Sequence, residues 1–374
     1  MNFLQKVRSE LETPRAERPF GSGWISGSFA LLAGIVGFLM VIVLRNPSLT
    51  SVPQLVAVHE SVPFRLALYF VLVSGFMLAA LSLVLRRDKT LGTAAMLVTL
   101  LATMIGSLPA HRDIQLGGVF FGIDFFILNV LFTGFLFIPI ERLFAQNRSQ
   151  EIFRDEWRED LFYYLVSSLF VQILTYLTLA PSNFVIHAND LGAVRAWVRG
   201  LPWIVQLVAI MLLTDIAQYW LHRAFHRVPF LWGFHAVHHS AKSMDWIAGA
   251  RMHFVEIIVL RSVTATPALV IGFEESAIQA YMLIVYVYST FIHSNLRGSF
   301  GFLEKILVVP RFHHWHHGIE EEAVDVNFAI HFPFIDRLFG THHLPDGKWP
   351  VAYGVAGHPV PRGYWKQLLY PFRR

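Results

Sequence analysis

The 374-residue sequence contains no cysteine and few charged side chains. Without cysteine there is neither a disulfide nor a thiolate ligand, so any bound metal must be held by nitrogen or oxygen. Charged residues make up only 15% of the chain, and hydrophobic residues make up 55%. A soluble domain carries roughly a quarter charged residues. The composition therefore predicts an integral membrane protein.

The charge pattern argues against two further features, nucleic-acid binding and a cleavable signal peptide. The net charge of +4 does not predict nucleic-acid binding, because Lys and Arg are spread over separate loops. The first 20 residues are polar and carry both charge signs. We therefore expect no cleavable signal peptide, which would need an early apolar run. The chain is expected to stay integral in the cell membrane or the endoplasmic reticulum, without a nucleic-acid partner.

Eight apolar runs approach the length that crosses a bilayer as a helix, which is about 20 residues. Four precede a polar segment at residues 141–160 and four follow it. We expect Pro181 to break the fifth run. The sequence thus predicts an all-α, polytopic helical bundle of about eight spans. The runs cover approximately residues 25–44, 64–85, 91–108, 119–140, 161–180, 202–221, 254–273 and 276–292.

The polar segment at 141–160 is the candidate domain boundary. Residues 1–150 are interpreted as a four-span membrane region of unknown role. Residues 151–374 are interpreted as a catalytic domain that ends in a histidine-rich cap. Cations gather on alternate sides of the predicted spans, which indicates cytoplasmic N- and C-termini under the positive-inside rule. The same span count places the cap and all the histidine groups on the cytoplasmic face.

Eleven of the eighteen histidines lie between residues 222 and 317, mostly in three tight groups. Neutral imidazole is a common metal ligand near neutral pH. Residues three or four apart share a helical face, so each group can present two or three nitrogens to one point. These ligands exceed what a four-coordinate zinc uses, so we predict a two-metal centre. The candidate ligands and catalytic residues are His222, His226, His235, His238, His239, His293, His313, His316 and His317, with His253 as a further candidate metal ligand.

Asp215 is the main candidate for a supporting residue. It lies seven residues before His222, on the same helical face and inside the sixth apolar run. An ionisable residue is costly there and marks function. We expect its carboxylate to hold a ligating imidazole in one tautomer.

The remaining histidines have less specific patterns. His253 is either a ligand or forms a structural hydrogen bond with Glu256 or Asp245. His314 does not fit the spacing of its group and is not a predicted ligand. Single histidines in loops are interpreted as solvated side chains: His59, His111, His187, His331, His342, His343 and His358.

The order of the histidine groups resembles the fatty acid hydroxylase / sterol desaturase superfamily of membrane oxidoreductases. The resemblance covers about residues 160–350, including segments 215–219, 291–295, 310–317, 325–328 and 336–341. It departs at Phe254, where relatives often carry proline, and at His293-Ser-Asn-Leu-Arg297, where some relatives have a further HxxxH pair. By this resemblance, one coordination position is filled by His253, Asn295 or water. Asn295, Asp245 and Glu256 are also candidates for residues that support the ligands.

The resemblance implies a non-haem di-iron enzyme that uses O2 and two electrons. Its expected substrate is a lipid of the sterol, fatty acyl or alkylglycerol type, oxidised at a C–H bond. Hydroxylation and desaturation both remain open. The sequence has no His-Pro-Gly-Gly segment of a fused cytochrome b5 domain, so electrons are expected from a separate electron-transfer protein.

Three other functions fit the pattern less well. A metal transporter would place polar ligands along a path at mid-membrane, whereas these histidines gather at one predicted surface. A bis-histidine haem protein would pair single histidines on facing helices. A zinc hydrolase would carry HExxH, which the sequence lacks. A membrane oxygenase or desaturase is the function predicted.

Overall fold

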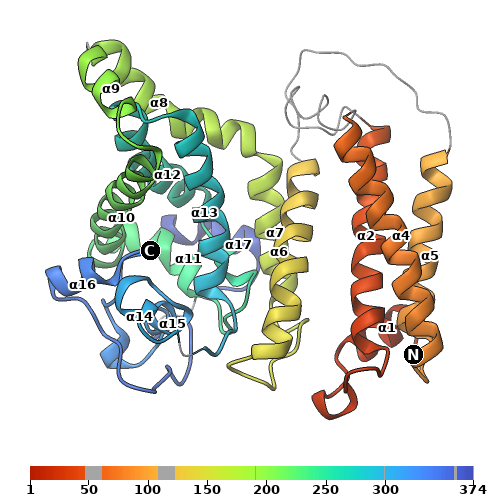
Figure 1. Ribbon diagram of the computed structural model, residues 1–374. Helices are drawn as coiled ribbons and strands as arrows, with labels where there is room; N and C mark the ends of the chain where they lie inside the picture. Colours follow the sequence, from red (N-terminus) through yellow and green to blue (C-terminus); the bar gives the residue numbers. More distant parts are fainter. Residues whose placement is uncertain (47–60, 108–122, 190, 299, 358–359, 374) are drawn as a thin grey trace. The chain divides into compact units, whose positions relative to one another are not determined.

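The computed structural model describes residues 1–46, 61–107, 123–189, 191–298, 300–357 and 360–373 (Figure 1). Within these residues the chain is helical, with two isolated β-bridges and no strand. The chain divides into two compact units. Residues 1–135 with 151–153 form the first, and residues 136–150 with 154–374 form the second. The predicted all-α class is confirmed.

The first unit packs three long helices through small residues. A Cβ added at Gly34 would lie 2.8 Å from Oγ1 of Thr99, so glycine allows the close approach of α2 and α5. Small residues at contacts are typical of helices that associate within a membrane. The helices begin with α1 (Phe3–Leu11), followed by α2 (Trp24–Arg45), α4 (Val62–Leu85) and α5 (Thr90–Ser107). Helix α6 (Ile123–Phe144) continues from this unit into the second.

The second unit contains all the predicted ligands. Its long helices are α7 (Trp157–Leu169), α8 (Val171–Ala188), α10 (Trp203–Arg227), α12 (Phe254–Ile271) and α13 (Glu275–His293). The shorter helices are α9 (Gly192–Arg199), α11 (Pro229–His239), α14 (Leu303–Ile306), α15 (Pro310–His316), α16 (Pro333–Phe339) and α17 (Tyr364–Leu369).

Four helices are long and apolar enough to cross a membrane, namely α2, α4, α10 and α12. The bent pair α7 and α8 gives a fifth if it counts as one span. The other three predicted runs also coincide with helices, α5, α6 and α13, and α5 is a shorter apolar helix. The coarser prediction of several membrane helices is confirmed, and the count of eight stays a prediction.

The break in the fifth apolar run lies at a different residue from the one expected. Helix α8 continues through Pro181 to Ala188. The chain bends by 59° between α7 and α8 instead, next to Phe170. A proline inside an apolar helix removes one hydrogen bond, and helices in membranes tolerate this loss when nearby groups satisfy the freed carbonyl. The proline was therefore a poor guide to the position of the bend.

A buried apolar cluster lies where α10, α13, α15 and α16 meet. Tyr219 is fully buried and its ring stacks on Phe339, with centroids 5.0 Å apart. Burial of a large apolar side chain contributes about 1.5–3 kcal/mol, so this cluster holds the ends of the helices firmly together. Its buried members are Tyr219, Ile292, Val308, Val309, Phe312, Phe328, Ala329 and Ile335. Three of the helices that it joins, α10, α13 and α15, carry histidines.

Candidate metal centre

Four helices deliver the histidines to one buried region. Helix α10 carries His222 and His226 and ends at Arg227, and a single residue separates it from Pro229, which starts α11. Pro310 starts α15, and α13 ends at His293. Proline is favoured at the first helical position because its fixed φ suits a helix and its missing N–H is not needed there. Pro229 and Pro310 therefore each begin a helix that carries histidines of an HxxHH group, with His317 at the C-cap of α15.

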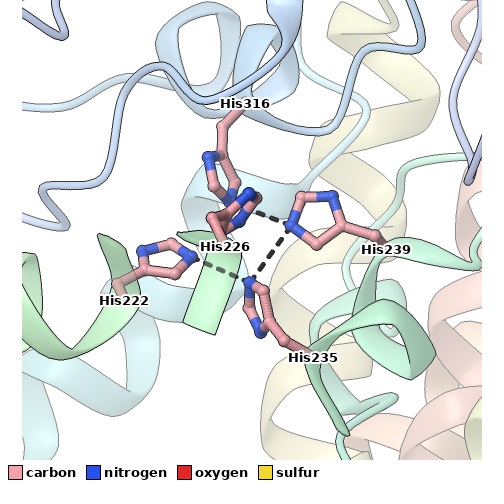
Figure 2. A group of neighbouring side chains, drawn as sticks. All are labelled: His222, His226, His235, His239 and His316. Carbon is pink, nitrogen blue, oxygen red and sulfur yellow. Dashed lines mark hydrogen bonds between the residues drawn. The ribbon is translucent and has the colours of Figure 1, made fainter. Parts of the chain in front are cut away.

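Five imidazoles form the first cluster, which we call the five-histidine group. One ring nitrogen of each lies within 4.8 Å of those of the others. The Nε2 atoms of His222 and His235 are 3.0 Å apart, and Nε2 of His239 lies 3.1 Å from that of His235 and 3.0 Å from that of His316. Figure 2 shows these rings turned toward one another. The members are His222, His226, His235, His239 and His316.

Four more imidazoles form the second cluster, the four-histidine group. Its members are His238, His293, His313 and His317, all of them buried. The Nε2 atom of His293 lies 3.2 Å from that of His238 and 3.0 Å from that of His313. The Nε2 atoms of His313 and His317 are 3.2 Å apart. Nine of the ten predicted ligands therefore gather in two compact groups.

The outer nitrogens of several rings face acceptors, which fixes their tautomers. In a neutral imidazole one nitrogen donates and the other carries a lone pair. A backbone carbonyl only accepts, so each Nδ1 that faces one must carry the proton. The Nδ1-to-carbonyl distances are 2.9 Å for His222 to Phe328, 3.0 Å for His238 to Arg251, 2.7 Å for His293 to Ser289 and 2.8 Å for His316 to Val326. Each of these rings points its Nε2 lone pair into its group.

Facing lone pairs call for a cation between them. The lone pairs of His238 and His293 meet at 3.2 Å, where two neutral rings of this tautomer cannot form a hydrogen bond. Burial lowers the pKa of the six rings on α11 and at the end of α15 well below its ordinary value, which keeps them neutral and able to bind a metal. An all-nitrogen donor set suits Fe, Zn, Cu or Ni. The residues present thus fit one metal ion in each group.

The segment 325–328 supplies carbonyls to the five-histidine group. Asp325 and Asn327 adopt left-handed conformations, with φ of 59° and 60°. The carbonyls of Val326 and Phe328 thereby face imidazoles. The Asn327 amide donates to the carbonyls of Phe312 and His343, which secures the unusual backbone. Such strain persists where the surroundings hold it in place, often at functional sites.

Asp215 does not contact an imidazole of the metal groups as we expected. Its carboxylate accepts backbone N–H groups from Ile330, His331 and Phe332, at 2.8, 3.1 and 2.7 Å. The Nδ1 atom of His222 bonds to the carbonyl of Phe328 instead. Asp215 therefore holds the segment that continues from this carbonyl, one step further from the ring than predicted.

His253 lies outside both groups. Its Nδ1 accepts from the backbone N–H of Val255 at 3.1 Å and caps α12, and its Nε2 lies 3.0 Å from the Leu368 carbonyl. The structure therefore does not place His253 among the gathered rings. Its ring also does not form the expected hydrogen bond with Glu256 or Asp245. Glu256 instead lies 2.5 Å from Nδ1 of His235, where it orients a ring of the five-histidine group.

Two other predicted supporting residues lie one step behind the ligands. The Asn295 side chain accepts from the backbone N–H of Asn147 and donates to its carbonyl. Asp245 forms a buried ion pair with Arg154, with 2.6 Å between Nε and Oδ2. Both residues therefore anchor loops that approach the four-histidine group, and their predicted role is indirect.

The histidines outside the two groups divide into several cases. His314 is buried and bonds to the Tyr353 hydroxyl and the Ser294 carbonyl, so its exclusion from the ligands agrees with its place in the structure. The interpretation of His331 as solvated is wrong, because it is 1% exposed and stacks on Tyr288. His187 is exposed, and His342 and His343 are half-buried. His59, His111 and His358 lie outside the described residues.

One contact was missed from the sequence. The carboxylate of Asp325 lies 3.5 Å from Nδ1 of His226 and 3.2 Å from Nε of Arg227. It provides an acidic partner for the one ring of the five-histidine group that is not fully buried. Its place at the start of the 325–328 segment, which the family resemblance already included, was the signal that could have found it.

Comparison with known proteins identifies the part of the chain that holds this site. Residues 207–341 match the family model described as fatty acid hydroxylase. These residues form a fatty acid hydroxylase domain. The domain includes all nine gathered histidines, and the expected resemblance is confirmed.

Relatives of the hydroxylase domain act on different lipids. An ornithine lipid hydroxylase of Rhizobium tropici is 28% identical over 48% of this chain and 54% of its own. The alkylglycerol monooxygenase of Homo sapiens is 30% identical over 39% of this chain and 32% of its own. The chain thus spans about half or a third of the length of these relatives. A putative methylsterol monooxygenase of Dictyostelium discoideum is 25% identical over 56% of this chain and 78% of its own. No solved structure matches this chain.

Proposed function

We propose that the chain is a membrane-bound lipid hydroxylase that uses O2 and two iron ions. One observation carries the proposal: nine imidazoles, eight of them buried and His226 partly buried, converge in two groups within a fatty acid hydroxylase domain. The five-histidine group would hold one iron and the four-histidine group the other. When bound, the paired irons would supply the reductive activation of O2 that a saturated C–H bond requires.

The overall reaction balances without any group outside this proposal. A C–H bond of the lipid, O2, two electrons and two protons give a C–OH group and one water. The electrons would come from a separate electron-transfer protein. The choice of hydroxylation over desaturation rests on the relatives, whose names describe hydroxylases and monooxygenases. Their lipids differ, so the proposal extends to a lipid substrate and no further.

The protein's own residues prepare the site in three ways. Backbone carbonyls and Glu256 hold the outer nitrogens as donors, which aims the lone pairs inward and raises the basicity of the ligands. Burial keeps the rings neutral. The low exposure of the ligands also keeps water away from the site, which protects a strong oxidant from side reactions.

The chain's organisation enters this proposal as well. Residues 151–374 would form the catalytic domain, and residues 1–150 a membrane region. Both termini and the metal centre would face the cytoplasm, in the cell membrane or the endoplasmic reticulum. The spread of cations over alternate loops supports this orientation.

Labelled O2 tests the proposed reaction. Purified protein in detergent is supplied with extracted lipids, a reductant and its electron donor under labelled O2, and the lipids are analysed by mass spectrometry. We expect one labelled oxygen atom in a hydroxylated lipid and two metal ions per chain. A new double bond without label would refute hydroxylation, and wild-type protein that binds no metal would refute the whole assignment.

Two variants provide the comparison. His316→Ala removes a ligand of the five-histidine group and should lose both metal and product. His187→Ala is the matched control, because His187 is exposed on α8 and contacts neither group. Equal turnover by the two variants would contradict the role of the histidine groups.

A further inference from the structure

A loop between α11 and α12 lies against two members of the four-histidine group. The carbonyl of Arg251 accepts the hydrogen bond from Nδ1 of His238, at 3.0 Å. Gly249 lies on the ring of His293: a Cβ there would be 2.9 Å from Nδ1 and 3.1 Å from Cγ. Only glycine allows the backbone this close to the imidazole. The loop at residues 245–251, which we call the supporting loop, therefore sets the position of both rings.

Buried ion pairs fasten both ends of the supporting loop. At one end, Arg154 donates from Nε and Nη2 to the carboxylate of Asp245, at 2.6 and 2.9 Å. At the other end, Nε of Arg251 donates to Oδ1 of Asp160 at 2.5 Å. Nη2 of Arg154 donates to the other oxygen of Asp160. The Asp160 carboxylate thus joins two guanidiniums that hold opposite ends of one loop.

The residues that fasten the loop are desolvated, and three of them come from outside the hydroxylase domain. Asp160 is fully buried, and Arg251 is 1% exposed. Glu156 adds a second carboxylate, 3.1 Å from Nη1 of Arg251, and its backbone has a φ of 73°. A left-handed glutamate is strained, and such strain persists only where the surroundings require it. Arg154, Glu156 and Asp160 all precede residue 207, where the family match begins.

The five-histidine group has separate supports. His222 and His316 bond to carbonyls of segment 325–328, and His235 bonds to Glu256. The supporting loop acts through His238 and His293, which belong to the other group. A change in the ion pairs should therefore affect one metal and spare the other.

We propose that Asp160 is a positioning residue that controls metal binding in the four-histidine group alone. The inference deepens the proposed function, because it rests on that group binding a metal. Loss of the Asp160 charge leaves two buried guanidiniums without their shared partner, and the supporting loop moves away from both rings. Loss of such an indirect support lowers metal affinity by about 10–100-fold.

Metal titration of the full chain tests the proposal without measuring activity. Protein stripped of metal is titrated with Co²⁺, followed by the visible absorption of the bound ion and by elemental analysis. The wild type should bind two equivalents tightly. Asp160→Asn should bind one equivalent as tightly as the wild type does, and a second about 10–100-fold more weakly. Gly249→Ala should produce the same selective loss, because its Cβ displaces the His293 ring from the other side.

Asp155→Asn is the matched control. It makes the same chemical change five residues earlier, where the carboxylate is exposed and pairs with Arg362 at the surface. It should bind two equivalents like the wild type. Asp160→Asn with two wild-type affinities, or with equal loss at both groups, would overturn the proposal while leaving the proposed metal centre intact. A wild type that binds no Co²⁺ would overturn both.

Discussion

Oε1 of Glu256 lies 2.5 Å from Nδ1 of His235, and both side chains are buried. This carboxylate lies closer to a ring of the five-histidine group than the Asp325 carboxylate does, which is 3.5 Å from Nδ1 of His226. A carboxylate partner makes the opposite nitrogen a stronger donor to a metal. Glu256 thus increases the basicity of a ring in the five-histidine group.

Glu256→Gln should weaken metal binding in the five-histidine group by about 10–100-fold, because an amide oxygen accepts a weaker hydrogen bond from Nδ1 of His235 than a carboxylate does. The four-histidine group should keep its affinity. Titration with Co²⁺ measures both sites in one experiment. Glu275→Gln, at the exposed start of α13, is the control and should behave like the wild type. Equal affinities in Glu256→Gln and the wild type would show that the carboxylate only fills space.

Asp215→Asn should destabilise the fold near the site. The carboxylate accepts three backbone N–H groups, and an amide presents one oxygen and one competing donor to them. A hydrogen bond to a charged group contributes about 1.5–3 kcal/mol, so we expect the free energy of unfolding to fall by about that amount. Thermal unfolding in detergent measures it. Metal-free protein should lose the same stability, because the bonds of Asp215 are to the backbone. A loss of stability confined to metal-loaded protein would instead indicate that Asp215 acts directly on a ligand.

The histidine spacing predicted which rings gather, because helical periodicity is a local property. The same spacing could not predict their division between groups. His238 and His239 are adjacent in sequence but belong to different groups, as do His316 and His317. Successive residues of a helix point about 100° apart, so neighbours can face two metals on either side of the helix. Which metal each one faces depends on how α11 and α15 pack, and that depends on contacts far apart in the chain.

The errors have the same physical origin. Asp215 was assigned to the ring that follows it on one helical face, but residues more than a hundred positions later occupy that space. His253 precedes a helix, and its ring caps that helix rather than reaching a metal. The charge pattern of the segment at 141–160 indicates a domain boundary, yet Arg154 and Asp160 in it are buried behind the site. A charge pattern alone does not distinguish a solvated face from a buried network.

Asn327 should be replaceable by glycine more easily than by alanine. Its φ of 60° strains any residue with a Cβ, at a cost of about 1–3 kcal/mol, and asparagine tolerates this region better than alanine does. Both variants lose the hydrogen bonds to Phe312 and His343. The comparison of Asn327→Gly with Asn327→Ala therefore cancels the loss of these bonds and leaves the backbone strain, set against the greater freedom of glycine in the unfolded chain. If the Asn327→Ala variant were as stable as Asn327→Gly, the left-handed backbone would not be required to aim the carbonyls of segment 325–328.

Acid should destabilise the metal-free protein. Burial lowers the pKa of rings such as His239 and His317 well below the value of about 6.5 that they have in an unfolded chain. Between the lowered pKa and 6.5 the unfolded chain binds more protons than the folded one, so stability rises with pH in this window. The stability that these neutral rings contribute should be fully present above pH ~6.5 and should fall as the pH is lowered below ~6.5. Thermal unfolding of stripped protein at pH 7.5 and 5.5 measures the change, and bound Co²⁺ should raise the midpoint at both values but less at pH 5.5, where protons compete for the same nitrogens. A metal-free midpoint that is equal or higher at pH 5.5 would mean that the rings are already protonated in the folded state, and it would contradict the neutral tautomers on which the metal centre depends.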